Sequence, residues 1–229
     1  MKQRALLIFA DSAHTDCQRR GWPSAFRILL ETQNFDFDEM PAFDIHLFTS
    51  RSHQLPDAST LQVHFQEGAS FGQRLENAIE CLARLGYREI VIVGRDCPQL
   101  EHKDIRLAFD LLQQYRLVLG PDHRGGCYLI GVHADDRGNL YGIRWQQNTD
   151  CEEIRHRFDP RSTVDLPVKL DLDTLEDVWL LADSKSRFAW VARGLIEALL
   201  TRFLMEIECS QPWFDEERID WQLPPPVIH

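Results

Sequence analysis

The sequence lacks the short motifs that would assign it to several familiar protein classes. It contains no GxxxxGK[ST] loop, no GxGxxG turn and no HExxH pair, so P-loop, dinucleotide-binding and zinc-protease chemistry have no support. None of its six cysteines forms a CxxC pair, and no histidine–cysteine cluster has zinc spacing. No apolar run approaches the roughly 20 residues that a membrane-spanning helix needs. These absences indicate an ordinary globular protein without a membrane span.

Basic residues are also scarce. The 229-residue chain has 25 lysine and arginine residues against 36 acidic ones, which gives a formal net charge of −11. Nucleic acids and anionic membranes both attract a basic face, so both kinds of partner are disfavoured. A small phosphorylated ligand remains open, because it needs only a local basic or metal-bearing pocket. The scattered cysteines, and an opening apolar run too short for a secretory leader, predict reduced thiols in a cytoplasm.

The most informative stretch is EIVIVGRDCPQL, residues 89–100. Its four consecutive β-branched residues, from Ile90 to Val93, are typical of a strand covered on both faces of a parallel sheet. Gly94 ends this strand, and Asp96 follows two positions later. Ligands of open α/β sheets lie just beyond the carboxyl ends of the strands. Asp96 is therefore placed where a carboxylate could hold a metal ion and a phosphate, although capping the next helix is an equal alternative.

Strand and helix patterns alternate along residues 1–183, which we interpret as one domain. The predicted strands are residues 5–10, 43–50, 61–65, 89–93, 116–119, 128–132 and 168–172; the predicted helices are residues 24–32, 71–85, 103–115, 149–158 and 174–182; residues 11–23 are predicted to be a polar loop. This alternation indicates right-handed βαβ units and a mainly parallel sheet. Too few residues separate Leu119 from Tyr128 for a crossover helix, so one antiparallel strand is expected there.

Residues 184–229 depart from this alternation and are predicted to be a helix and a tail packed on the domain. Between Phe188 and Leu204 the apolar residues cover a wide arc. Such an arc is typical of a core helix or of a helix laid across a sheet. A homodimer interface formed by this helix is the alternative interpretation.

Two further stretches place glycine or arginine near a strand end or a helix start. In GPDHRGG, residues 120–126, Gly125 and Gly126 permit close backbone approach, and their N–H groups can receive an anion. A glycine hairpin turn is the structural alternative. In FGQRL, residues 71–75, Arg74 lies in the first turn of the predicted helix, where an arginine is most often a solvated charge.

The stretch LDLDTLED, residues 170–177, contributes several acidic side chains. If this stretch is extended, Asp171 and Asp173 point to opposite faces because side chains alternate along a strand. Only one of the two should then reach a given site. Thr174 with Asp177 is also a variant of the capping box that starts helices, which explains part of the motif structurally.

Together, these motifs resemble a known family. GQRLENAI, VIVGRDCPQL, GPDHRGGCYLIG, Trp145 and LDLDTLED occur in the order and spacing of the bacterial MobA-like GT-A group, often labelled glycosyltransferase or rSAM/selenodomain-associated transferase. The resemblance covers roughly residues 71–182. It implies a single-domain nucleotide-diphospho-sugar transferase-like (GT-A) fold, a three-layer α/β sandwich whose mostly parallel sheet has an antiparallel strand. It also implies metal-dependent transfer of a nucleotide-activated sugar, or of a nucleotidyl group, to a small-molecule acceptor.

The resemblance also implies roles for individual residues. Asp96 and Asp173 match acidic positions expected to hold Mg²⁺ or Mn²⁺, so they are the candidate catalytic and metal-binding residues. Magnesium favours one or two carboxylates with substrate phosphate oxygens completing its octahedron. The metal would neutralise the charge that builds on a diphosphate leaving group. The candidate nucleotide- and phosphate-binding residues are Arg74, Arg95, Arg124, Gly125 and Gly126.

The chain departs from that group's pattern at three places. The loop after the first strand, DSAHTDCQRRGWP, has no lysine and has lost the glycine spacing of a phosphate loop, although Arg19 and Arg20 bring positive charge. Arg124 replaces an acidic residue, and Arg95 replaces a serine or threonine. An arginine near the metal would oppose a cation or stand in for it by gripping phosphate. A catalytically degenerate relative that binds or assembles is therefore the main alternative; an unrelated phosphotransferase with Asp96 as nucleophile is a weaker one.

Overall fold

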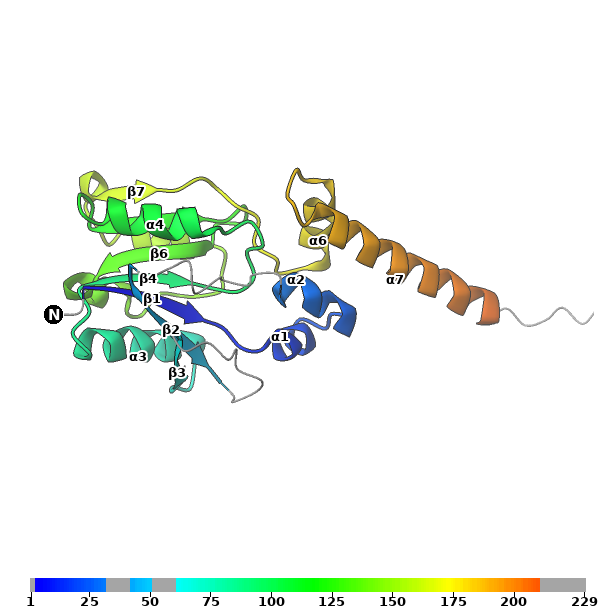
Figure 1. Ribbon diagram of the computed structural model, residues 1–229, viewed down its shortest axis with the longest axis horizontal. Helices are drawn as coiled ribbons and strands as arrows, with labels where there is room; N and C mark the ends of the chain where they lie inside the picture. The colour runs from blue at the N-terminus through cyan, green and yellow to red at the C-terminus, as the bar shows by residue number, and fades with distance from the viewer. Residues whose placement is uncertain (1–2, 32–41, 51–60, 211–229) are drawn as a thin grey trace, which may run out of the picture.

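A seven-stranded sheet forms the centre of the computed structural model, which describes residues 3–31, 42–50 and 61–210 (Figure 1). The strands are β1 (Arg4–Phe9), β2 (Asp44–Thr49), β3 (Leu61–Phe65), β4 (Glu89–Val93), β5 (Leu117–Pro121), β6 (Cys127–His133) and β7 (Thr163–Asp165). Their order across the sheet is β3-β2-β1-β4-β6-β5-β7. β6 runs antiparallel to β4 and β5, and the other neighbours are parallel. The predicted antiparallel strand is confirmed.

The helices follow the expected alternation in most of the chain. They are α1 (Ala13–Arg19), α2 (Arg27–Glu31), α3 (Phe71–Arg84), α4 (His102–Leu111), α5 (Asp150–Arg155), α6 (Leu175–Asp183) and α7 (Ala189–Ser210). The capping box predicted at the start of α6 is present, since the Thr174 hydroxyl accepts the N–H of Asp177 and the Asp177 carboxylate accepts the N–H of Thr174. Local capping chemistry therefore sets where this helix begins.

Two apolar layers cover the two faces of the sheet. Side chains alternate along β1, so Ala5 and Leu7 pack in one core with α3, whereas Leu6 and Ile8 pack in the other with α4. All of β4 is buried, as its β-branched run predicts. Helices α3 and α4 lie on opposite faces of the sheet (Figure 1). The result is the predicted three-layer α/β sandwich.

A third apolar cluster joins helices from both ends of the chain. It contains Trp22 and Phe26 beside α1 and α2, Val178 and Leu181 of α6, and Ile196 of α7. These helices gather beyond one end of the sheet, and α7 extends away from the rest of the molecule (Figure 1). This packing brings the segment after β1 beside the segment that precedes α6.

Two predicted elements are wrong. The predicted loop 11–23 contains α1, because the Ser12 hydroxyl caps its first turn by accepting the N–H of Thr15 and its apolar residues Ala13 and Cys17 are buried. The predicted strand 168–172 is absent; its one sheet contact is an isolated bridge between Lys169 and Asp122. The last strand is instead β7, which comes before that stretch.

Helix α7 is partly packed on the domain and partly exposed. The start of α7 packs on α6, while Trp190 and Leu200 on the same helix are 73% and 49% exposed. The homodimer interface through this helix, and the division into residues 1–183 and 184–229, remain predictions. The tail at residues 211–229 lies outside the described residues. Within the described ranges, none of the helices has the length and apolar character needed to cross a bilayer.

Candidate functional site

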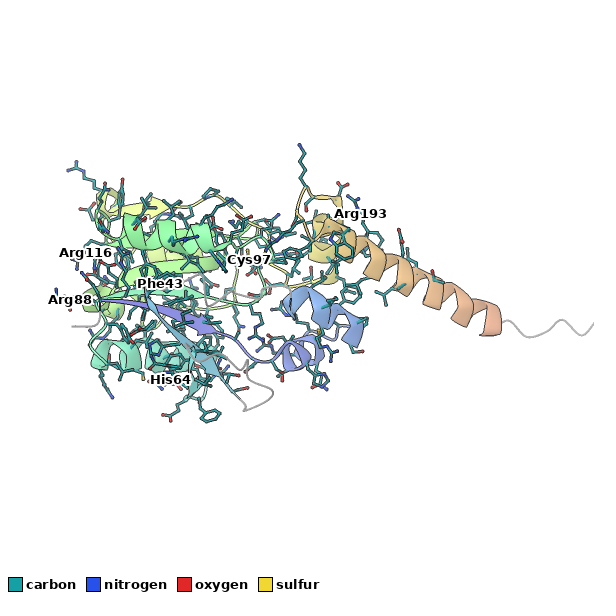
Figure 2. All side chains as sticks on the ribbon, in the orientation of Figure 1. Phe43, His64, Arg88, Cys97, Arg116 and Arg193 are labelled. Atoms are coloured by element: carbon teal, nitrogen blue, oxygen red, sulfur yellow. The ribbon has the colours of Figure 1, made fainter. Side chains whose placement is uncertain are left out.

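A polar cleft of about 380 Å³ lies at the carboxyl ends of β1, β4 and β5. This is the edge of the sheet where α/β proteins bind ligands. Six of the residues singled out from the sequence line the cleft: Arg74, Arg95, Asp96, Arg124, Gly126 and Asp173. Gly125 does not line it. Figure 2 places Cys97, the neighbour of Asp96, at the end of the sheet that faces α1, α2 and α6.

Asp96 and Asp173 converge on one guanidinium group, that of Arg20. Arg20 Nη2 donates to Asp96 Oδ2 at 2.7 Å, and Arg20 Nη1 donates to Asp173 Oδ1 at 2.8 Å. Nη1 also donates to the backbone carbonyl of Leu172. The two acidic side chains therefore meet at one rim of the sheet, as the resemblance implies, but a cation of the chain itself stands between them.

Helix packing carries Arg20 to this position. Arg20 is the C-cap residue of α1, and α1 belongs to the apolar cluster that also contains α6. The Arg20 side chain is 11% exposed, and its guanidinium carbon lies 5.4 Å from the centre of the buried Trp22 ring. Burial alone would lower the pKa of Arg20, but the carboxylates of Asp96 and Asp173 raise it above its ordinary value. Arg20 therefore keeps its charge.

The absence of a side chain at Gly94 allows the Asp96 carboxylate to lie over the end of β4. A Cβ atom at Gly94 would lie 2.5 Å from Asp96 Oδ1, so the side chain folds back over the strand end only because position 94 has no side chain. The backbone carbonyl of Asp96 accepts the N–H of Leu172 at 2.8 Å, which ties the loop after β4 to the segment that carries Asp173. The sharp turn after β4 is thus part of the site.

Arg74 and Arg95 reach the cleft from two other elements. Arg74 Nε donates to Gln66 Oε1 at 3.2 Å, and Arg95 Nη1 donates to the carbonyl of Asp11 at 3.3 Å. The acceptor oxygen atoms in these two contacts are neutral. The contacts help to orient the two arginines at the cleft.

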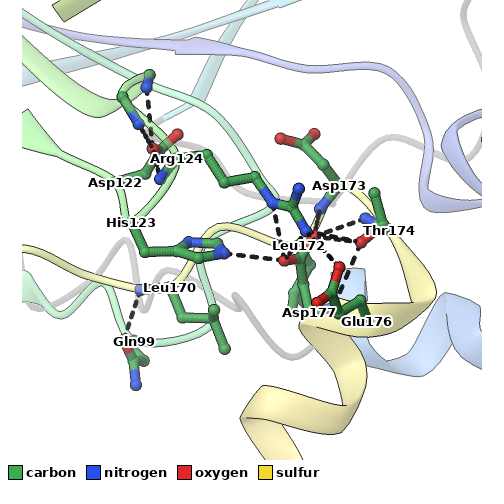
Figure 3. Close-up of polar contacts among 12 residues, drawn as sticks. Gln99, Asp122, His123, Arg124, Leu170, Leu172, Asp173, Thr174, Glu176 and Asp177 are labelled. Carbon is green, nitrogen blue, oxygen red and sulfur yellow. Dashed lines mark hydrogen bonds and ion pairs between the residues drawn. The ribbon is translucent and has the colours of Figure 1, made fainter. Parts of the chain in front are cut away.

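The glycine turn is closed by a carboxylate of the chain. Asp122 Oδ1 accepts the backbone N–H groups of Arg124, Gly125 and Gly126 at 2.6, 2.7 and 2.9 Å (Figure 3). The expectation that the N–H groups of Gly125 and Gly126 are exposed to a ligand anion is therefore wrong, because Asp122 already accepts them. Asp122 therefore organises this turn.

Arg124 binds the start of α6 and not the Asp96–Asp173 pair. Its Nε and Nη2 atoms donate to Asp177 Oδ1 at 3.0 and 2.7 Å, and Nη2 also donates to the Thr174 hydroxyl at 3.0 Å (Figure 3). His123 Nε2 lies 2.9 Å from the same Asp177 oxygen. Asp177 is fully buried, so this cluster fastens the glycine turn to α6.

Asp171 is a site residue that its spacing does not predict. Asp171 and Asp173 both line the cleft, contrary to the expectation that only one would, because this stretch is not a strand. Asp171 is 9% exposed, and its Oδ1 atom has no hydrogen-bond partner among the described residues. Burial, followed by the charges of Asp96 and Asp173, raises the pKa of Asp171 well above its ordinary value. The folded protein therefore favours the neutral acid.

Replacing Asp171 with asparagine is expected to raise the free energy of unfolding at pH 8 by about 1–2 kcal/mol, the scale of a poorly satisfied buried polar group. A folded-state pKa above the unfolded-state value means that the favourable contribution of Asp171 exists at low pH and is lost as the pH rises through the folded-state pKa. The gain should therefore shrink towards pH 4. Thermal unfolding across this pH range measures it.

Asp183→Asn is the matched control, because Asp183 is exposed at the end of α6. Its stability should stay unchanged at both pH values. An Asp171→Asn protein that is less stable than the wild type at pH 8 would show that the charged carboxylate is needed for folding.

Local sequence patterns single out neither Asp16 nor Asp171 as a site residue, and they leave the position of Arg20 open. Asp16 is buried in α1 beside Arg19, and burial raises its pKa. For Asp16, the sequence offers one local indication: Ser12 is a typical N-cap residue and predicts a helix in this segment. Nothing in the local pattern indicates that this helix would place Arg20 against Asp96.

Two solved structures show which class of fold the chain has. A candidate nucleotide-diphospho-sugar transferase from Desulfovibrio desulfuricans G20 is 21% identical, with a TM-score of 0.71 over 89% of this chain and 99% of that chain. The 4-diphosphocytidyl-2C-methyl-D-erythritol synthase from Anaerococcus prevotii DSM 20548 is 10% identical, with a TM-score of 0.51 over 78% of this chain and 94% of that chain. The protein therefore has a nucleotide-diphospho-sugar transferase-like fold, as predicted.

Sequence comparison gives a narrower similarity. The model of a family described as an uncharacterized protein conserved in bacteria (DUF2064) matches residues 39–147. No protein with a curated description matches the sequence significantly. A protein of Mycobacterium tuberculosis H37Rv solved in complex with manganese is 20% identical, with a TM-score of 0.45 over 78% of this chain and 97% of that chain; the manganese belongs to that protein, and so weak a likeness carries no conclusion here.

The arrangement of the Asp96–Asp173 pair does not fit a divalent metal ion. Mg²⁺ and Mn²⁺ would require carboxylate oxygens that face an open coordination position. Here the facing oxygens, Asp96 Oδ2 and Asp173 Oδ1, both accept hydrogen bonds from Arg20. Within the described part of the chain, no group of three or more histidine, cysteine, aspartate or glutamate side chains has a metal-holding arrangement. The cation that the pair contacts is a guanidinium.

Proposed function

We propose that this protein is a transferase that acts on a nucleotide-activated small molecule and passes a sugar or a nucleotidyl group to a small acceptor. One observation carries the proposal: Asp96 and Asp173 converge on Arg20 in a polar cleft at the carboxyl ends of the strands. The transferase-like fold supports it. We also propose that the protein is related to the MobA-like and rSAM-associated transferases, which its motifs resemble.

Arginines would hold the phosphates in this cleft. Arg74 and Arg95 line it from two different elements, and Arg20 lies between the two carboxylates. The planar guanidinium group matches the oxygens of a phosphate and keeps its charge at any physiological pH. Such preorganised positive charge stabilises the negative charge that develops on a diphosphate or phosphate leaving group. The predicted Mg²⁺ or Mn²⁺ would need the carboxylates that Arg20 now occupies.

Asp173 is the group that we assign to take a proton from the acceptor. Its side chain is 44% exposed at the rim of the cleft. Burial, followed by the charge of Asp96, raises the pKa of Asp173 above its ordinary value, although Arg20 opposes this effect. A carboxylate with a raised pKa is a better general base at neutral pH.

Titration with UDP, GDP and CTP compounds, followed by thermal unfolding, tests the proposal. A nucleotide at about 100 times its Kd should stabilise the fold by about 2.7 kcal/mol, which corresponds to roughly 5–10 °C for a chain of this size. Asp96→Asn should lower turnover with the active donor by at least about 100-fold, because it removes one carboxylate that holds Arg20. A melting temperature that no nucleotide changes would count against a transferase.

A catalytically degenerate binding or assembly protein is the second candidate. The observation that favours it is the closure of two expected ligand sites by the chain itself: Arg20 occupies the carboxylates, and Asp122 occupies the N–H groups of the glycine turn. Such a protein would bind a nucleotide without turning it over. Robust turnover that is lost in Asp96→Asn would eliminate this candidate.

A further inference from the structure

The cation between Asp96 and Asp173 belongs to the chain. We propose that Arg20 is the resident cation of this cleft and takes the place of a divalent metal ion, so that a nucleotide phosphate binds here without Mg²⁺ or Mn²⁺. The part of this proposal that concerns nucleotide rests on the proposed function. The part that concerns the cation rests on the Arg20 contacts alone.

The contacts of Arg20 have the geometry of strong charge-assisted hydrogen bonds. The distances of 2.7 and 2.8 Å to Asp96 Oδ2 and Asp173 Oδ1 lie in the range of N⁺–H···O⁻ pairs. One guanidinium group spans both carboxylates because its two terminal nitrogens point in different directions. A lysine ammonium would have to reach both acceptors from a single nitrogen atom.

Arg20 is held from the side of α1 as well as by its acidic partners. Its side chain lies against the buried Trp22 ring, and Nη1 also donates to the carbonyl of Leu172. A metal ion that took both carboxylates would leave the guanidinium in this 11% exposed position without these two charged partners. Leaving a buried charge without its partner is strongly unfavourable, so the competition favours Arg20.

The guanidinium also keeps a donor for a ligand. Among the contacts within the described residues, Nη1 donates to Asp173 and Leu172, whereas Nη2 donates to Asp96. Each terminal nitrogen of an arginine carries two N–H groups, so the second N–H of Nη2 remains for a phosphate oxygen. Arg74 and Arg95 line the same cleft and supply further positive charge. A phosphate would therefore meet arginine donors where the motif resemblance implies a metal ion.

Titration of the purified protein with Mn²⁺ tests directly whether Arg20 is the resident cation. Electron paramagnetic resonance measures the concentration of free Mn²⁺ during the titration. Arg20→Gln should bind one Mn²⁺ at least tenfold more tightly than the wild type, because the two carboxylates lose their cation. Adding Asp173→Asn to Arg20→Gln should abolish this gain. Arg19→Gln is the matched control, since it removes the same charge one position earlier but from a side chain that contacts Asp11 and Asp16.

Two results would overturn the proposal. One is an Arg20→Gln protein, folded by circular dichroism, that binds Mn²⁺ no better than Arg19→Gln. The other is a wild-type protein that binds one Mn²⁺ tightly and loses this binding in Asp96→Asn. The second measurement needs no change at Arg20, so it decides the question even if Arg20→Gln does not fold; weak wild-type binding that Asp96→Asn leaves unchanged supports the proposal.

Nucleotide binding with and without EDTA tests the phosphate part. The Kd of the nucleotide identified by thermal unfolding should change less than twofold when EDTA removes divalent ions. A loss of tenfold or more in affinity would overturn metal-independent binding. If no nucleotide binds at all, the proposed function fails, whereas the Mn²⁺ titrations of the wild type, Arg19→Gln and Arg20→Gln still decide whether Arg20 is the resident cation.

Discussion

Replacing Asp177 with alanine is expected to lower the free energy of unfolding by about 3–5 kcal/mol, the cost of removing one partner from a buried ion pair. Asp177 is fully buried and accepts hydrogen bonds from Arg124, from Thr174 and from the backbone N–H of Asp173. His123 also contacts it. The variant would leave Arg124 half-buried without its main partner and would remove the capping box of α6. Denaturant unfolding at pH 7 measures the loss.

The pH dependence of this loss identifies its cause. Burial alone would raise the pKa of Asp177, but hydrogen bonds from Arg124, Thr174 and His123 hold it below its ordinary value. A lowered folded-state pKa means that the stabilisation is complete above the unfolded-state pKa and is lost as the pH falls through the folded-state pKa. The difference between the wild type and Asp177→Ala should therefore narrow below about pH 4.

Glu176→Ala is the matched control for this experiment. Glu176 precedes Asp177 in the chain, and its side chain is 78% exposed. Its Oε2 atom lies 3.5 Å from Arg124 Nη2. An exposed ion pair contributes about 0–1 kcal/mol, so this variant should stay close to the wild type. If Asp177→Ala costs no more than Glu176→Ala, the buried cluster does not stabilise the fold.

Gly125→Ala is expected to lower the free energy of unfolding by about 2–4 kcal/mol and to distort the glycine turn. Gly125 has a φ of +103°, which residues with a side chain rarely adopt, and a Cβ atom there would lie 2.3 Å from the carbonyl oxygen of Asn148. The backbone of the turn would have to move, which would also weaken the contacts that Asp122 makes with its N–H groups. Thermal and denaturant unfolding measure the effect.

Gly138→Ala provides the comparison, because a Cβ atom at Gly138 meets nothing within 4 Å and its backbone does not need a positive φ. This variant should change stability by less than about 1 kcal/mol. Equal stability of the two alanine variants would mean that the turn at Gly125 relaxes without cost. The role assigned to glycine there would then be wrong.

The sequence predicted the sheet well because strand signals are local. The β-branched run of β4 and the short gap between β5 and β6 predict a buried central strand and an antiparallel neighbour. The 168–172 stretch shows the limit of such signals: its alternating pattern resembles a strand, but an edge position in the sheet is taken by β7 and leaves this stretch with one bridge. A local pattern cannot report which segment reaches a sheet edge first.

The candidate site was predicted in part. Asp96 and Asp173 were placed together through the order and spacing of the motifs, and they do meet in the cleft. Their shared partner Arg20 was not assigned, because its distance from both along the chain is large and its own segment was expected to be a loop. Arg124 is predicted to bind a phosphate; in the structure its side chain donates to Asp177 and Thr174 at the start of α6.

By itself, the sequence determined the class of fold, the capping box of α6 and the position of Asp96 at a strand end, because these depend on neighbouring residues and on the periods of helix and strand. Only the tertiary structure decided which charge faces the two aspartates. Arg20 reaches them because α1 and α6 both belong to the third apolar cluster, and burial then makes its ion pairs strong. Packing between segments far apart in the chain, and the desolvation that follows, leave no trace in a local pattern.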